Sequence, residues 1–180
     1  MRLRGPAQRV GMSLIFARLE SKRSHFNVHN MVATVAAPSR RDWTLLAIAA
    51  ARGGPLTPVQ LQKSLFLLGK QFPDELGPGF YRFEPYNYGP FSKQVYVDAE
   101  ELGRDGLVAF TSHSGGRWLD YVATPAGTRQ ASDVGAHAPP NLLAYLARVV
   151  NWSSEQSFPN LLRWIYAKYP EYRAKSIFTD

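Results

Sequence analysis

The sequence predicts a mainly α, α+β protein with a winged helix-turn-helix-like core, a small β-hairpin as the wing and two added C-terminal helices. Three observations predict this class. Apolar residues recur at helical spacing in three successive segments, two short strand-like runs follow them, and helical apolar stripes resume near the C-terminus. The order helix, helix, capped helix, hairpin is that of a winged helix.

Size and composition set the limits within which this fold must form. With 180 residues, 45% hydrophobic and 19% charged, the chain can bury one sizeable core. Cysteine is absent, which excludes disulfides, thiolate nucleophiles and Cys-ligated zinc. No apolar run approaches the 18 or so residues that cross a bilayer. We therefore expect a cytoplasmic protein that makes no use of a membrane.

The net charge of +7 is concentrated at the N-terminus. Residues 1–41 hold eight of the 21 Lys and Arg residues but only one of the 14 acidic residues, which leaves residues 42–180 neutral. We predict a basic, disordered leader over residues 1–41, with four readings left open. It could be an arm that binds nucleic acid through phosphates, a segment that folds on a partner, a transit peptide, or the product of a start codon upstream of Met12 or Met31.

The first two expected helices precede a segment rich in chain breakers. Asp42 is the expected N-cap of a helix that ends at Gly53-Gly54, and Thr57 is the N-cap of a second helix that has Pro58 in its first turn and runs to about residue 70. Residues 72–91 hold too much proline and glycine for a helix and too many aromatic rings for a linker. We expect this segment to pack on the domain.

The third helix is expected over residues 93–104, with Ser92 as its cap. Tyr96, Ala99 and Leu102 would face the core. The carboxylates of this segment are placed on the outward face and interpreted as solvated surface, since general acid-base catalysis needs carboxyls that converge in a cleft. They are Asp98, Glu100, Glu101 and Asp105.

Strand-like runs at residues 107–112 and 117–123 predict a β-hairpin, which completes a winged-helix-like core over residues 42–135. His113-Ser114-Gly115-Gly116 would form its turn, and the glycines the tip of the wing. Thr124-Pro125 then starts another helix.

The last segment, residues 136–180, predicts two helices. One begins at Pro139-Pro140, and the other runs from about residue 158 to Pro170. They are expected to pack as a helical hairpin on the core or on a second subunit, which leaves a homodimer open. Trp152 and Trp164 are interpreted as core residues.

No catalytic or metal-binding motif stands out in this sequence. It has no Gly-x-Ser-x-Gly elbow and no P-loop. His25 and His29 are spaced as two ligands on one helical face, but no third ligand accompanies them. We therefore expect a protein that is not an enzyme and that has no metal and no cofactor.

Two spaced motifs resemble a known family. Leu61-Gln62-Lys63-Ser64-Leu65-Phe66-Leu67-Leu68 and, about twenty residues on, Tyr86-Asn87-Tyr88-Gly89-Pro90-Phe91-Ser92-Lys93-Gln94-Val95-Tyr96 are similar to the Leu-Gln-Lys helix and the Tyr-Gly-Pro turn of the Panacea domain. This is the family of SocA-like antitoxins and phage-associated proteins. The resemblance covers about residues 56–127, and it departs from the family at Phe91, where a smaller aliphatic residue is common.

The resemblance implies a protein that neutralises or delivers a partner protein, such as a toxin or a protease, in a toxin-antitoxin or phage-related setting. It points to Gln62, Lys63, Tyr88, Gly89, Pro90 and Tyr96 as characteristic positions. From the residues alone, Tyr86, Tyr88 and Phe91 around a Gly-Pro turn have the composition of a binding hot spot, or else of a plug between helices. Lys63 would reach the surface or bond the carbonyls of the turn. The expected partner-binding set is Gln62, Lys63, Tyr86, Tyr88, Gly89, Pro90, Phe91 and Tyr96.

The alternative is a DNA-binding transcriptional regulator. It would use Lys93, Gln94 and Arg104 of the third helix together with Arg117 of the wing. Residues 92–105 carry two basic and four acidic side chains, and an acidic recognition helix repels phosphate. The insertion after the second helix also removes the short turn of a helix-turn-helix.

Overall fold

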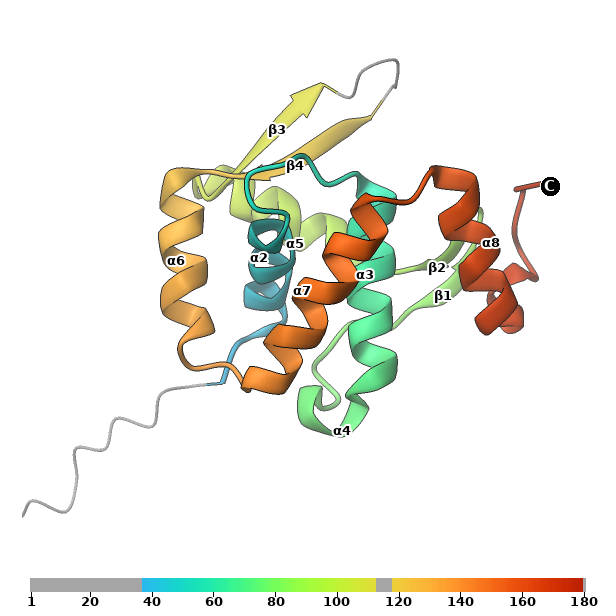
Figure 1. Ribbon diagram of the computed structural model, residues 1–180, viewed down its shortest axis with the longest axis horizontal. Coiled ribbons are helices and arrows are strands. Elements are labelled where there is room, and N and C mark those ends of the chain that lie inside the picture. Colours follow the sequence, from blue (N-terminus) through green and yellow to red (C-terminus); the bar gives the residue numbers. More distant parts are fainter. Residues whose placement is uncertain (1–36, 113–117, 180) are drawn as a thin grey trace, which may run out of the picture. The chain divides into compact units, whose positions relative to one another are not determined.

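The computed structural model describes residues 37–112 and 118–179, and this part of the chain is mainly helical with a small antiparallel hairpin, a winged-helix-like α+β fold (Figure 1). Residues 1–36 of the expected leader, with His25 and His29, lie outside the described residues. So does the turn of the wing, with His113, Gly115-Gly116 and Arg117. Among the described residues, no helix is both long enough and apolar enough to cross a membrane.

Helix α2 (Arg40–Ala50) begins earlier than the sequence predicts. Its N-cap is Ser39, whose hydroxyl accepts a hydrogen bond from the Asp42 amide while the Asp42 carboxylate reaches back to the Ser39 amide. The expected capping role of Asp42 is therefore wrong: Asp42 is the third residue of a capping box. As a result Arg40 and Arg41, which the charge division assigned to the leader, lie in the first turn of the helix.

Helix α3 (Pro58–Gln71) begins as expected, with Thr57 as N-cap and Pro58 in the first turn. Its residues from Leu61 to Leu68 are all buried, on every side of the helix. The reason is its central place among α2, α7 (Pro140–Ser154), β2 (Gly89–Phe91) and β4 (Leu119–Ala123) (Figure 1). An all-round buried helix can carry polar side chains inward, and α3 does so at Gln62 and Lys63.

The segment rich in proline and glycine packs on the core as expected, and it also contains elements that the sequence did not reveal. A short helix, α4 (Pro73–Leu76), is followed by two strands, β1 (Glu84–Tyr86) and β2 (Gly89–Phe91). The strands pair in antiparallel fashion, with Tyr86 opposite Gly89, so Asn87 and Tyr88 form a two-residue turn.

Helix α5 (Lys93–Arg104) has its predicted bounds, whereas in the wing the first strand begins one residue later and the second two residues later than predicted. The wing consists of β3 (Val108–Ser112) and β4 (Leu119–Ala123), with Phe110 opposite Tyr121. Leu56 pairs with Tyr121 through backbone hydrogen bonds of 2.9 and 3.0 Å, which ties the loop before α3 to the wing. One expectation fails, since the Ser92 side chain makes no capping hydrogen bond.

The C-terminal part contains α6 (Pro125–Gly135), α7 (Pro140–Ser154), α8 (Phe158–Lys168) and a final 3₁₀ turn, η2 (Pro170–Arg173). Helix α7 packs along α3 and α2, whereas α8 packs against β2 and η2. The two helices were expected to pack on each other as a hairpin, but each makes its main contacts with other elements. Trp152 is half-buried, but Trp164 is 38% exposed, so its assignment to the core is wrong.

Candidate functional site

Two buried side chains of α3 hold the backbone at the end of the β1–β2 hairpin. Gln62 donates from Nε2 to the Ser92 carbonyl oxygen at 2.9 Å and accepts the Ser92 amide on Oε1 at 3.0 Å. Lys63 donates from Nζ to the Pro90 carbonyl oxygen at 2.9 Å. These three bonds fix the end of the hairpin, from Pro90 to Ser92, to α3 at the centre of the fold.

Lys63 is only 2% exposed, and this burial lowers the pKa of its amine to about 7. The bond to the carbonyl of the turn is one of the two roles predicted for it. Neither Gln62 nor Lys63 reaches the surface, so the expectation that they contact a partner directly is wrong. The sequence shows how far Gln62 and Lys63 lie from the turn along the chain, but not that their polar groups point into the interior.

Gly89 and Pro90 are also buried, and Gly89 cannot be replaced freely. Its φ is +84°, and an added Cβ would lie 3.2 Å from Cε1 of Tyr166. The turn beside it is also held by the C-terminal segment, because the Asn87 carbonyl oxygen accepts the Ile177 amide at 3.0 Å and the Ser176 hydroxyl at 3.3 Å. Sequence reasoning missed this contact between residues about ninety positions apart.

The hairpin presents aromatic rings to the solvent. Tyr86 is 50% and Tyr88 41% exposed, while Phe91 and Tyr96 are half-buried. The centroids of Tyr86 and Phe91 lie 4.9 Å apart and those of Phe91 and Tyr96 5.4 Å apart. On the other side of the turn, the Tyr88 ring meets that of Phe158 at 5.2 Å. We call Tyr86, Tyr88, Phe91, Tyr96 and Phe158 the aromatic surface.

Phe158 belongs to this surface although the sequence analysis did not select it. It lies in the first turn of α8, 70 residues from Tyr88, and it is 41% exposed. In sequence it looks like the first member of the apolar stripe of α8. Only the contact with Tyr88 marks it as part of the surface.

Asp98 is not on an outward face as expected; it is 2% exposed and lies in a polar network. Arg40 donates to it from Nε at 2.8 Å, the Tyr81 hydroxyl at 2.5 Å and Gln94 Nε2 at 2.9 Å. Burial by itself would raise the pKa of Asp98, but these donors outweigh burial and lower it. The ion pair between Arg40 and Asp98 joins α2 to α5, and both carboxylate oxygens of Asp98 already accept hydrogen bonds.

The residues of the DNA-binding alternative do not form one basic face. Lys93 is exposed, Gln94 is bound to Asp98, and Arg104 pairs with Glu100 at 3.7 Å, while Arg117 lies outside the described residues. Glu100 and Glu101 are exposed on the same helix. Within residues 37–112 and 118–179, no group of three or more His, Asp or Glu side chains could hold a metal ion.

No protein-family model and no curated protein matches this chain. The resemblance to the Panacea domain therefore stays a prediction from its two motifs.

Proposed function

We propose that this protein is an interaction module of the SocA-like antitoxin type, which binds a partner protein and neutralises or delivers it. The observation that carries the proposal is the exposure of Tyr86 and Tyr88 on a hairpin whose backbone is fixed from within. Exposed tyrosines on a rigid support give large contact area with little loss of side-chain entropy, as binding hot spots do.

The buried residues of the motif fit this proposal in a supporting role. Gln62 and Lys63 hold the backbone from Pro90 to Ser92, and Gly89 permits the close approach of Tyr166. Their contribution to binding would be to position the rings. In this proposal the protein acts in the cytoplasm, on a toxin or protease, as a monomer or a homodimer and without catalysis of its own.

The test is Tyr88→Ala in the full chain, assayed with the protein encoded next to it as the binding partner. A hot-spot ring contributes about 2 kcal/mol, so we expect roughly 30-fold weaker binding. The melting temperature should stay nearly unchanged, because the ring is substantially exposed. Trp118→Ala is the matched control, since Trp118 is another exposed aromatic residue, at 50% against 41% for Tyr88, but lies beside β4.

Loss of binding in the control as well, or unchanged binding in Tyr88→Ala, would contradict this placement of the surface. If Tyr88 is a core plug instead, its removal should destabilise the protein by about 3 to 5 kcal/mol.

The alternative proposal, a DNA-binding regulator, is favoured by the winged-helix order of elements. It is tested by measuring binding of the full chain to duplex DNA at increasing salt. We expect weak binding without sequence preference that falls steeply with salt. Sequence-specific binding at physiological salt that Lys93→Gln abolishes would favour the regulator.

A further inference from the structure

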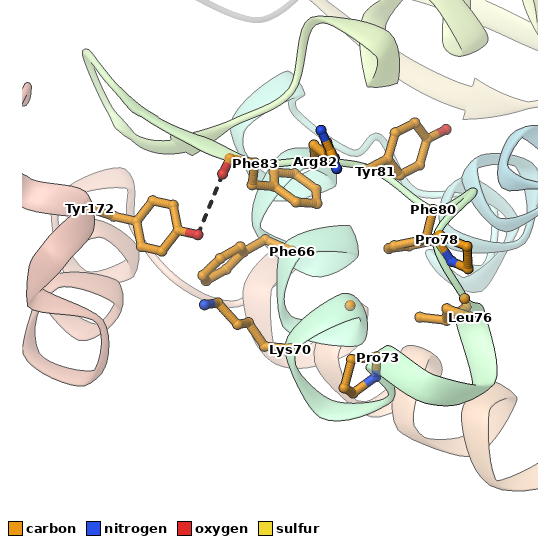
Figure 2. A pocket seen from close by; sticks show the side chains of 12 residues that line it. Phe66, Lys70, Pro73, Leu76, Pro78, Phe80, Tyr81, Arg82, Phe83 and Tyr172 are labelled. Carbon is orange, nitrogen blue, oxygen red and sulfur yellow. Dashed lines mark hydrogen bonds between the residues drawn. The ribbon is translucent and has the colours of Figure 1, made fainter.

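A cavity of about 260 Å³ lies between α3, α4 and the segment that leads into β1 (Figure 2). No residue of the aromatic surface lines it. Its walls are largely aromatic, and Phe66, Phe80, Phe83 and Tyr172 contribute rings to it. Phe66 meets Phe83 at 5.5 Å and Tyr172 at 4.8 Å between centroids. The Tyr172 hydroxyl donates to the Phe83 carbonyl oxygen at 3.5 Å, which ties η2 to the rim.

Gly69 forms part of the floor of this cavity. A Cβ at this position would lie 3.0 Å from Cε1 of Phe80, so the ring of Phe80 rests against the bare helix backbone. Glycine within a helix costs about 1 kcal/mol relative to alanine. Glycine therefore lets the Phe80 ring, which lines the cavity, pack directly on α3 at a position where alanine would favour the helix.

Two cations line the cavity. The Lys70 amine lies 5.6 Å from the Phe66 ring and 5.3 Å from the Tyr172 ring. Arg82 is exposed, and its side chain makes no ion pair within the described part of the chain. The acid nearest to Lys70 is Glu171, 3.8 Å away and exposed, and such a surface pair contributes little.

We propose that this cavity binds an aromatic carboxylate. The rings favour a planar apolar group, and because Lys70 already occupies the cation-π position over two of them, a cationic ligand would be repelled. The carboxylate would lie toward Lys70, where it competes with Glu171. The volume is slightly below that of pockets for drug-sized ligands, which fits one ring with a short acidic group.

The experiment uses the full chain and three probes that share one ring, namely phenylacetate, phenylacetamide and 2-phenylethylamine. Binding is followed by chemical-shift changes of backbone amides. We expect phenylacetate to bind with a dissociation constant on the order of 1 mM. The largest shifts should fall at Gly69 and Gly77, the neutral amide should bind about fivefold more weakly, and the amine should not bind measurably.

Variants that remove a charge should weaken phenylacetate binding when the charge is that of Lys70 and strengthen it when the charge is that of Glu171. Lys70→Met keeps a long apolar side chain over the rings, and it should weaken phenylacetate binding about fivefold without changing phenylacetamide binding. Glu171→Gln removes the competing acid and should strengthen phenylacetate binding. Lys93→Met is the matched control, because Lys93 is an exposed lysine of α5 that does not line the cavity, and it should change neither.

Equal affinity for the acid and the amide, or shifts that map elsewhere on the protein, would overturn the proposal. So would a Lys70→Met variant that melts normally and binds phenylacetate as before. A peptide that ends in phenylalanine, compared with its C-terminal amide, distinguishes a chain terminus from a free acid as the source of the carboxylate. Tyr88→Ala should leave phenylacetate binding unchanged, so failure of the cavity proposal and failure of the proposed function are separable.

Discussion

Lys63 is a single residue whose burial should make the free energy of unfolding depend on pH. Its amine is buried and has the Pro90 carbonyl oxygen as acceptor. Burial lowers the pKa of this amine from 10.5 to about 7, so the charged form is disfavoured in the folded state. A lysine that holds a turn in this way makes the stability of the protein depend on pH.

The predicted pH dependence follows from proton binding. Between about pH 7 and pH 10.5 the unfolded chain keeps the Lys63 proton and the folded chain has lost it, so the free energy of unfolding rises with pH. The slope from this residue should approach 1.4 kcal/mol per pH unit. Lys63→Met lacks this group, and urea unfolding of both proteins at pH 7, 8.5 and 10 measures the difference. Parallel curves for the two proteins would show that Lys63 does not titrate in this range.

Asp98 carries a second prediction at the residue scale. Asp98→Asn removes the charge that Arg40, Tyr81 and Gln94 surround, and we expect a loss of about 3 kcal/mol in the free energy of unfolding at pH 7. Because the folded pKa is lowered, the contribution is present above about pH 3.8 and is lost as the pH falls through the folded value. The exposed Asp133 on α6 is the control, and Asp133→Asn should stay within about 0.5 kcal/mol of the wild type.

At the scale of elements, the helix starts differ in how their free amides are satisfied. Helix α2 and helix α3 begin with complete capping boxes, from Ser39 to Asp42 and from Thr57 to Gln60. Helix α5 begins after Ser92 without a capping hydrogen bond from the Ser92 hydroxyl. Gln62 binds the amide and carbonyl of Ser92 itself, which holds the start of α5 in place but is a different bond from a cap on the first-turn amides. The N-cap hydroxyl of Thr57 therefore stabilises its helix by a hydrogen bond, whereas the N-cap hydroxyl of Ser92 does not.

This difference is measurable with two conservative substitutions. Thr57→Ala should lower the free energy of unfolding by about 1 kcal/mol, because the Gln60 amide loses its acceptor. Ser92→Ala should cost less than about 0.5 kcal/mol, since the backbone bonds to Gln62 remain. Chemical denaturation of both variants decides the point, and a larger effect at Ser92 than at Thr57 would contradict the assignment.

At the scale of the whole described molecule, the buried residues form two hydrophobic clusters. One includes Trp43, Leu65 and the core face of α5, and the other includes Phe66, Ile165 and Tyr172. Helix α3 belongs to both, because Leu65 and Leu68 face one cluster while Phe66 and Leu67 face the other. Two clusters built on opposite faces of one helix cannot lose their packing independently.

We therefore predict a single cooperative unfolding transition for the described part of the chain. Trp43 reports on one cluster, and Trp152 and Trp164 report on the region of the other. Trp118, the fourth tryptophan, is replaced by Phe in both variants so that it does not contribute. Fluorescence of a Trp43→Phe, Trp118→Phe variant and of a Trp118→Phe, Trp152→Phe, Trp164→Phe variant should each give the same urea midpoint as the helical circular dichroism of that variant. Midpoints that differ between the optical probes would show that the clusters unfold separately.

The sequence by itself determined the fold class and most element bounds. Thr57-Pro58 and Thr124-Pro125 act through local backbone chemistry, so their effect can be read without the rest of the chain. Apolar spacing predicted α3, α5, α7 and α8 for the same reason. The end of α2 was placed too late, since the helix ends at Ala50 and Arg52, before Gly53, is the first residue with a positive φ. The exposed Tyr86 and Tyr88 were also selected from composition, although with a core plug as the equal alternative.

The tertiary structure alone decided which polar residues point inward and which distant residues meet. Asp98 is buried because Arg40, 58 positions away, neutralises it, and Phe158 joins the aromatic surface because α8 packs beside the turn of Tyr88. The inward course of Gln62 and Lys63 has the same origin, since their acceptors lie on β2 and Ser92. Such contacts depend on how whole helices pack, and no local spacing in the chain encodes them.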